Sequence, residues 1–267
     1  MNIPQRVAKL IARAGLCSRR DAEKLIAAGR VKLDGKTLTT QGAATDDPVR
    51  ILVDGKPLPA PQRARLWRYH KPAGLVTTAR DPEGRPTVFD RLPATLPRVM
   101  TVGRLDLNSE GLLLLTNDGA LARHLELPAT SWVRRYRVRV HGRPDPARLK
   151  NLAQGTTVDG VRYGRVEAAL ESEKGSNAWL AMALTEGRNR EVRKLCESMG
   201  LQVSRLIRVA YGPFQLGLLP RGEVEEIPAR VLKDQVGGAF GGKAKEKNAP
   251  RGGAAIHKSG EAAKTCG

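Results

Sequence analysis

Apolar residues near the N-terminus recur with the spacing of an α-helix. Over residues 4–14 one side is apolar and the other basic, and the apolar positions are Val7, Leu10, Ile11 and Ala14. A second helix is predicted to begin at Ser18, because Asp21 follows three residues later in a capping-box-like arrangement. Gly29 should end it, since glycine readily adopts the left-handed conformation that follows helices.

Two short apolar runs with Asp-Gly turns come next, over residues 31–35 and 51–55. Glycine supplies the positive φ that such hairpin turns need, so these runs predict strands. Pro57, Pro59 and Pro61 should then stiffen a connector. We therefore expect a small module and linker over residues 1–62, followed by a larger domain over residues 63–236.

The larger domain alternates short strands with turns and a few helices, which predicts an α+β fold. The clearest strand covers residues 131–140. Its apolar face carries Tyr136, Val138 and Val140, and its basic face carries Arg135, Arg137 and Arg139. Further strands are expected at residues 179–184 and 201–211, with a helix at residues 191–199 that Gly200 ends.

Composition points to a nucleic-acid partner. Lys and Arg number 46 against 27 Asp and Glu, a formal charge of +19 that attracts polyanions. Cys17, Cys196 and Cys266 show no paired spacing, which argues against disulfides or a zinc site and fits a reducing cytoplasm. No apolar segment suggests a signal peptide or membrane span. Residues 237–267 are basic, with few large apolar side chains, and are predicted to be disordered.

The most informative segment is an acidic loop over residues 103–111, between apolar runs at residues 99–102 and 112–115 that predict buried strands. Core packing at both ends should hold Asp106 in place beside Arg104. Taken alone, the pattern favours a turn hydrogen bond of Asp106, or an ion pair with Arg104, over a catalytic role.

The whole string from Gly103 to Gly119 nevertheless resembles the signature of the bacterial RsuA/RluB family of pseudouridine synthases. Three other segments are similar to that family, namely residues 69–74, 81–90 and 186–195, and residues 1–60 resemble the S4 RNA-binding domain. The resemblance implies an S4-like α+β domain followed by a catalytic domain on a mixed, mainly antiparallel sheet with flanking helices. Within the family, residues 81–90 and the extended C-terminus are most similar to the B-type enzymes, which act on the large ribosomal subunit.

The implied activity is isomerisation of one uridine in ribosomal RNA, expected in the 23S RNA of the large subunit, without a cofactor. The bond from uracil N1 to the ribose breaks, the base turns, and C5 is joined instead. In the family an aspartate, here Asp106, either attacks the sugar carbon or takes a proton from the ribose, and the sequence leaves both routes open.

The resemblance also assigns two partners to Asp106. Arg193 would keep the carboxylate ionised and oriented, and Tyr136 would stack on the target base. The pattern alone fits a helix-surface arginine equally well and favours a core tyrosine. Leu206 could wall the pocket, although a strand-core role is favoured, and Asn108 and Glu110 are expected to shape the loop.

RNA contacts are expected from two groups of cations. Arg104, Arg188 and Arg190 lie in the motifs that should line the cleft, and the helices near the N-terminus carry Arg6, Arg19, Arg20 and Lys24. Each one alone is more typical of solvated charge, but together they favour phosphate binding without base specificity. The uridine must leave its stack, so a hairpin loop or bulge is the expected substrate.

Three alternatives stay open at this point. The substrate could be 16S RNA of the small subunit, or the chain could be a non-catalytic S4-domain factor in RNA binding or ribosome assembly. A metal-dependent nuclease is disfavoured, because His70, His124, His141 and His257 show no ligand spacing. We therefore expect no metal, and a monomer whose partner is ribosomal RNA.

Overall fold

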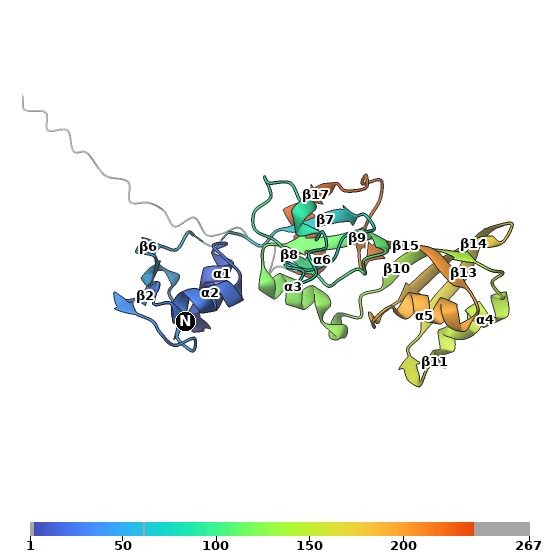
Figure 1. The fold of residues 1–267 in the computed structure, drawn as a ribbon, viewed down its shortest axis with the longest axis horizontal. Helices are drawn as coiled ribbons and strands as arrows, with labels where there is room; N and C mark the ends of the chain where they lie inside the picture. The colour runs from blue at the N-terminus through green and yellow to red at the C-terminus, as the bar shows by residue number, and fades with distance from the viewer. Residues whose placement is uncertain (1–2, 61, 238–267) are drawn as a thin grey trace, which may run out of the picture.

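The computed structural model describes residues 3–60 and 62–237 (Figure 1). The tail predicted to be disordered lies outside the described residues except for Gly237. The small N-terminal part is at one end of an elongated molecule, and the larger part carries the main sheet (Figure 1). Both parts contain helices and strands, as the α+β prediction required.

The N-terminal part packs two helices against a small sheet with strand order β3-β2-β5-β6. Its elements are β1 (Gln5–Arg6), α1 (Val7–Arg13), α2 (Arg19–Ala27), β2 (Val31–Leu33), β3 (Lys36–Thr37), β4 (Ala44–Thr45), β5 (Ile51–Val53) and β6 (Lys56–Pro57). Ser18 caps α2 as predicted, its hydroxyl oxygen accepting the Asp21 backbone N–H at 3.1 Å. Both helices and both strands were correctly predicted.

The prediction for the Asp-Gly turns is confirmed, whereas the prediction for the start of the connector is wrong. Asp34 and Gly35 both have positive φ, and so do Asp54 and Gly55, as the predicted hairpins demand. The prediction for Pro57 was wrong, because this residue ends β6 and pairs with Leu52 instead of opening the connector. Proline is tolerated there because β6 is an edge strand.

The larger part is built on a nine-stranded sheet whose main path is β13-β14-β10-β15-β9-β7-β17. Its elements are β7 (Leu66–Lys71), β8 (Met100–Val102), β9 (Ser109–Thr116), α3 (Gly119–Glu126), β10 (Arg134–His141), α4 (Pro146–Asn151), β11 (Thr156–Val158), β12 (Val161–Tyr163), β13 (Val166–Lys174), β14 (Asn177–Leu184), α5 (Glu191–Ser198), β15 (Gln202–Tyr211), β16 (Phe214–Gln215), β17 (Val224–Glu226) and α6 (Ala229–Val236). Only β9 and β15 pair in parallel among these strands, so the sheet is mixed and mainly antiparallel.

The parallel junction of β9 and β15 depends on a glycine. Gly111 has a φ of 102°, and a Cβ there would overlap the backbone of Arg208 on the neighbouring strand. Every residue of β9 is buried, which explains the continuous apolar run that predicted it. The strand begins at Ser109, so the acidic loop is shorter than expected and ends at Asn108.

Helix α5 covers one face of the sheet beyond this junction (Figure 1). Its apolar stripe packs with β10 and β14, in a core that includes Val138, Leu180, Val192 and Leu195. The predicted alternation of β10 is present, because Arg135, Arg137 and Arg139 are exposed on the opposite face. No helix in the described part of the chain is long and apolar enough to cross a membrane.

Candidate active site

A cavity of about 490 Å³ opens beside the β9–β15 junction. Its wall comes from the acidic loop at residues 103–108, from β10 and β15, and from the segment that leads into α5. Three sequence segments singled out for their motifs therefore meet in space, although about 80 residues separate the acidic loop from α5. Asp106, Tyr136 and Leu206 are among the lining residues.

The backbone carbonyls of the acidic loop from Leu105 to Asn108 all accept hydrogen bonds. Thr77 Oγ1 donates to the Leu105 oxygen at 2.7 Å, and the Gly74 amide donates to the Leu107 oxygen at 2.8 Å. Glu126 accepts the Gly103 amide at 2.6 Å, and Leu105 is buried. The loop is consequently a rigid support, since buried backbone groups without partners are costly.

The carboxylate of Asp106 is half-buried and lines the cavity. It makes no ion pair or side-chain hydrogen bond with any residue that the structure describes, including Arg104, which is exposed. Its oxygens are therefore free to meet a ligand. The expected Asp106–Arg104 pair is absent within residues 3–60 and 62–237.

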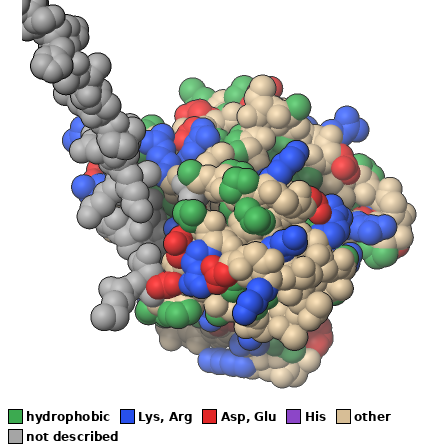
Figure 2. All heavy atoms as spheres, turned by 90° about the vertical axis from the view of Figure 1, so that its left-hand side faces the viewer, with side chains coloured by type: hydrophobic (Ala, Val, Ile, Leu, Met, Phe, Trp, Pro, Cys, Tyr) green, Lys and Arg blue, Asp and Glu red, His purple; other side chains and the backbone are tan. Residues whose placement is uncertain are grey.

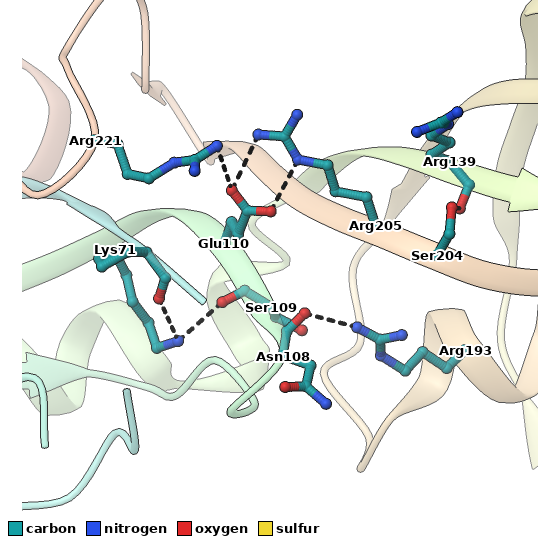
Figure 3. Close-up of polar contacts among 10 residues, drawn as sticks. Lys71, Asn108, Ser109, Glu110, Arg139, Arg193, Ser204, Arg205 and Arg221 are labelled. Atoms are coloured by element: carbon teal, nitrogen blue, oxygen red, sulfur yellow. Dashed lines mark hydrogen bonds and ion pairs between the residues drawn. The ribbon is translucent and has the colours of Figure 1, made fainter. Parts of the chain in front are cut away.

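Lys71 is the main support of the loop, and no sequence pattern had pointed to it. Its side chain is fully buried, and Nζ donates to the carbonyl oxygens of Ser109 at 2.9 Å, Pro72 at 3.0 Å, Asp106 at 3.2 Å and Leu107 at 3.4 Å (Figure 3). Burial lowers the pKa of this ammonium to about 8, while nearby Asp106 and Glu110 oppose the shift. The one sequence signal that could have identified Lys71 was its position in residues 69–74, one of the segments that resemble the family.

Arg193 lies behind the loop, on the first turns of α5. Its guanidinium is buried and donates from Nη2 to the Asn108 carbonyl at 2.8 Å, while Nε has no partner among the described residues (Figure 3). Burial lowers its pKa, with neighbouring Arg190 adding to the effect, and the charge of Asp106 acts in the opposite direction. The expected contact with the carboxylate is thus replaced by a contact with the loop that carries it.

Tyr136 and Leu206 face the cavity from adjacent strands. Tyr136 is half-buried and Leu206 almost fully buried, and both line the cavity opposite the acidic loop. A flat base could lie between an aromatic ring and an aliphatic wall here. The pattern had favoured a core tyrosine, but this ring lines the cavity, next to a point where β15 carries one extra residue, Val209, in its pairing with β10.

Two buried charged residues in the cavity wall were not anticipated. Arg208 donates from Nε to the Leu112 oxygen at 2.7 Å and leaves Nη2 without a partner among the described residues. Glu191 accepts the Arg188 amide at 2.9 Å through one oxygen, and burial raises its pKa. Strand and helix periodicity could not reveal them, because each one occupies a position that is usually apolar.

The predicted RNA contacts fall into two places. Arg104, Arg188 and Arg190 line the cavity, and Arg188 also pairs with Glu186 at 2.6 Å. Arg6 and Arg19 line a separate surface hollow of about 440 Å³ on the N-terminal part, and Arg20 and Lys24 are exposed on α2. Figure 2 shows blue side chains scattered over this end of the molecule, interspersed with acidic and apolar ones.

The N-terminal part and the catalytic part touch through an ion pair at 3.8 Å between Arg13 on α1 and Asp118, which caps α3. Among the described residues, no group of three or more His, Cys, Asp or Glu side chains could hold a metal ion. His70, His124 and His141 therefore belong to no such group, and His257 lies outside the described residues.

Comparison with known proteins identifies relatives over most of the chain. The family model for RNA pseudouridylate synthase matches residues 65–198, and the S4 domain model matches residues 5–43. An uncharacterized RNA pseudouridine synthase of Rickettsia prowazekii (strain Madrid E) is 47% identical over 86% of this chain and 97% of its own length. Ribosomal large subunit pseudouridine synthase B of Salmonella typhi is 45% identical, over 84% of this chain and 79% of that protein.

A solved structure agrees at the level of the fold. The crystal structure of a pseudouridylate synthase aligns with 86% of this chain and 99% of that chain, with a TM-score of 0.60 and 23% sequence identity.

Proposed function

Because the chain belongs to the RNA pseudouridylate synthase family, we propose that it converts a uridine of ribosomal RNA into pseudouridine, with Asp106 as the catalytic carboxylate. The observation that carries this assignment is the free carboxylate of Asp106, which faces a cavity while the loop beneath it is fixed by Lys71 and Arg193.

The reaction needs one group that acts at the ribose while uracil leaves and returns. Asp106 can attack the sugar carbon or remove a ribose proton, and either route requires an ionised carboxylate close to the nucleoside. Lys71 and Arg193 lie near enough for their positive charges to interact with the carboxylate. No cofactor is required, since the reaction is an isomerisation: the bond from uracil N1 to the ribose is replaced by one from C5, and the proton that C5 loses is balanced by one that N1 gains.

Tyr136 holds the detached base in this scheme. Its ring and Leu206 form the walls against which uracil can turn, and the phenol hydroxyl is available to help remove the proton from C5. The target uridine reaches the cavity by leaving its stack, and Arg104, Arg188 and Arg190 at the cavity bind the flanking phosphates.

We further propose large-subunit RNA as the substrate, because the relative in Salmonella typhi carries that name at 45% identity. Small-subunit RNA is the second candidate. The N-terminal residues 1–62 act as an S4-like RNA-binding domain with its linker, residues 63–236 as the catalytic domain, and the whole works as a cytoplasmic monomer. Arg6, Arg19, Arg20 and Lys24 supply phosphate contacts on the N-terminal domain.

The decisive experiment replaces Asp106 by Asn in the full chain. Pseudouridine formation should fall by on the order of 10⁴-fold or more, because the amide can neither attack nor take a proton, while affinity for ribosomal RNA should stay within a factor of about 3. Pseudouridine is measured by chemical mapping of ribosomal RNA taken from cells that lack the protein. Asp159→Asn is the matched control, since Asp159 is an exposed turn residue with positive φ that asparagine accommodates.

The same assay separates the alternatives. A non-catalytic RNA-binding factor predicts no pseudouridine from the unmodified protein either. A nuclease predicts strand cleavage that excess chelator abolishes. Full turnover by the Asp106→Asn protein would refute the assignment of the carboxylate.

A further inference from the structure

The face of the sheet opposite the cavity carries charge that the proposed reaction does not use. On β10, Arg135, Arg137 and Arg139 are exposed, with Trp179 and Lys174 on the two strands beyond. A hollow of about 560 Å³ lies there, lined by Arg139, Ser172, Lys174, Asn177 and Trp179.

Four of these side chains form a row across the strands. Arg205 on β15 is directly opposite Arg139 on β10, Arg139 is opposite Trp179 on β14, and Trp179 is opposite Ser172 on β13. We call these four residues the cross-strand row. Since side chains directly opposite one another on a sheet are in contact range, the row is one continuous surface.

The charges along the row are unevenly balanced. Arg205 pairs with Glu110 at 2.8 Å, and Arg137 beside the row pairs with Glu171 at 2.7 Å. Arg139 and Lys174 have no ion-pair partner in the described part of the chain. Figure 3 shows the guanidinium of Arg139 on the same side of the strands as those of Arg205 and Arg221, with no carboxylate drawn against it.

The uncompensated charge of this surface is available to an anionic ligand. Glu110 already balances the charge of Arg205, whereas Arg139, directly opposite it, has no carboxylate of its own. Trp179 adds an aromatic surface in the same hollow, with the Arg137 guanidinium 4.8 Å from its ring centroid. Cations that track a backbone beside an aromatic ring are the features that bind single-stranded nucleic acid.

We propose that the cross-strand row, with Lys174, is a second RNA-binding surface. It takes a single-stranded segment of the ribosomal RNA substrate other than the one that presents the uridine, with phosphates on Arg139 and Lys174 and a base on Trp179. We choose RNA over a protein partner for two reasons. The inference rests on the proposed function, which acts on RNA, and the unpaired cations Arg139 and Lys174 attract a polyanion. Binding here would anchor a long RNA while the cavity on the other face performs the reaction.

The test uses Asp106→Asn protein as the background, so that binding is measured without turnover, and deproteinised large-subunit ribosomal RNA as the probe. The double change Arg139→Gln with Lys174→Gln should weaken binding about 10-fold or more at 0.15 M salt and lower the slope of log affinity against log salt by about 1.4, roughly 0.7 for each lost phosphate contact. Trp179→Leu should weaken binding about 10-fold with the salt slope unchanged, because stacking is uncharged.

The control removes two charges elsewhere. Lys150 on α4 and Lys233 on α6 are exposed, and the double change Lys150→Gln with Lys233→Gln should leave the salt slope within about 0.3 of the parent. Equal affinity and slope in parent and Arg139/Lys174 variant would overturn the proposal. Unchanged RNA binding with lost association to assembling ribosomal particles would assign the surface to a protein and overturn it as well.

This outcome is independent of the catalytic assignment. If Asp106→Asn protein proves fully active, the role of the carboxylate fails while the binding measurements on the cross-strand row stand. If the Arg139/Lys174 and Trp179 variants bind RNA normally and Asp106→Asn protein is inactive, only the proposal of a second RNA-binding surface is refuted.

Discussion

Ser109 and Glu110 are neighbours in sequence, yet the strand sends their side chains to opposite faces of the sheet (Figure 3). On the Ser109 side, the cations Lys71 and Arg193 donate to backbone carbonyls of the acidic loop. On the Glu110 side, Arg205 donates to the carboxylate itself at 2.8 Å, and Arg221 forms an ion pair with it at 3.0 Å. One face therefore leaves the Asp106 carboxylate unpaired, and the other neutralises the carboxylate that it carries.

The difference has a physical reason. A buried cation that is satisfied by carbonyl dipoles still projects a positive field into the cavity without occupying the oxygens of Asp106. A cation in a direct ion pair loses most of that field. Under the proposed function, the enclosed face carries out the reaction. The outer face binds RNA through Arg139 and Lys174, the cations that Glu110 and Glu171 leave unpaired.

Among the variants that test this difference between the two faces, those at Arg193 should have the largest effect. Replacing Arg193 by Met removes the donor to the Asn108 carbonyl and a buried positive charge that interacts with Asp106. We expect the turnover number to fall about 10²-fold, comparable to the loss of one preorganised donor at a reacting centre, with little change in KM. Steady-state assays with a ribosomal RNA fragment measure both.

Arg193→Lys is the control for charge. It keeps a cation but cannot reproduce the guanidinium contact, so its turnover should lie between those of the parent and the Met variant. An unchanged turnover number in Arg193→Met, at equal thermal stability, would mean that the guanidinium has no part in positioning Asp106.

Lys71 should have a smaller effect on turnover and a visible one on stability. Lys71→Met leaves four loop carbonyls without their shared donor, so the free energy of unfolding should fall by about 1–3 kcal/mol. Turnover should drop about 10-fold because the loop loosens. Urea denaturation followed by fluorescence measures the first quantity.

The pH dependence of that stability difference has a definite sign. The folded pKa of Lys71 is lowered from 10.5 to about 8, so between these values the unfolded chain binds a proton that the folded chain has released. Stability from this group therefore rises with pH over that window, and the gap between parent and Lys71→Met should widen from about pH 8 towards pH 10. A constant gap would contradict the lowered pKa.

Lys71 also illustrates what the sequence can and cannot predict. The helices at the N-terminus, the Asp-Gly hairpins, and the strands at residues 131–140 and 201–211 were predictable, because each depends on local periodicity or turn chemistry. The resemblance located Asp106, Tyr136 and Arg193, and the fold brings all three to one place. Their catalytic roles remain predictions.

Contacts between distant segments were beyond the sequence. Nothing local indicates that Lys71 reaches the carbonyls of residues 106, 107 and 109, or that Arg193 meets Asn108 in place of Asp106. The Lys71 contacts follow from the antiparallel pairing of β7 with β9. The Arg193 contact follows from the parallel pairing of β9 with β15, against which α5 packs, and this pairing joins segments about 100 residues apart. Likewise, the cross-strand row exists only through the registers of four strands.

The smallest effect should come from Glu110, and it has the opposite sign on the outer face. Glu110→Gln frees Arg205 and Arg221, so affinity for ribosomal RNA should rise about 3-fold and its salt slope should become steeper. Turnover should change less than about 2-fold, because the cavity face keeps its own cations. An affinity that falls would show that Glu110 orders these arginines for binding instead of neutralising them.

The stability of the Glu110→Gln protein should carry its own pH signature. The hydrogen bond from Arg205 lowers the folded pKa of Glu110 below its ordinary value. The stability it contributes is therefore present above the pKa of the unfolded chain and is lost as pH falls through the folded pKa. The parent should be the more stable protein at neutral pH, and the difference should close in acid, where thermal denaturation from neutral pH down to about pH 3 checks it.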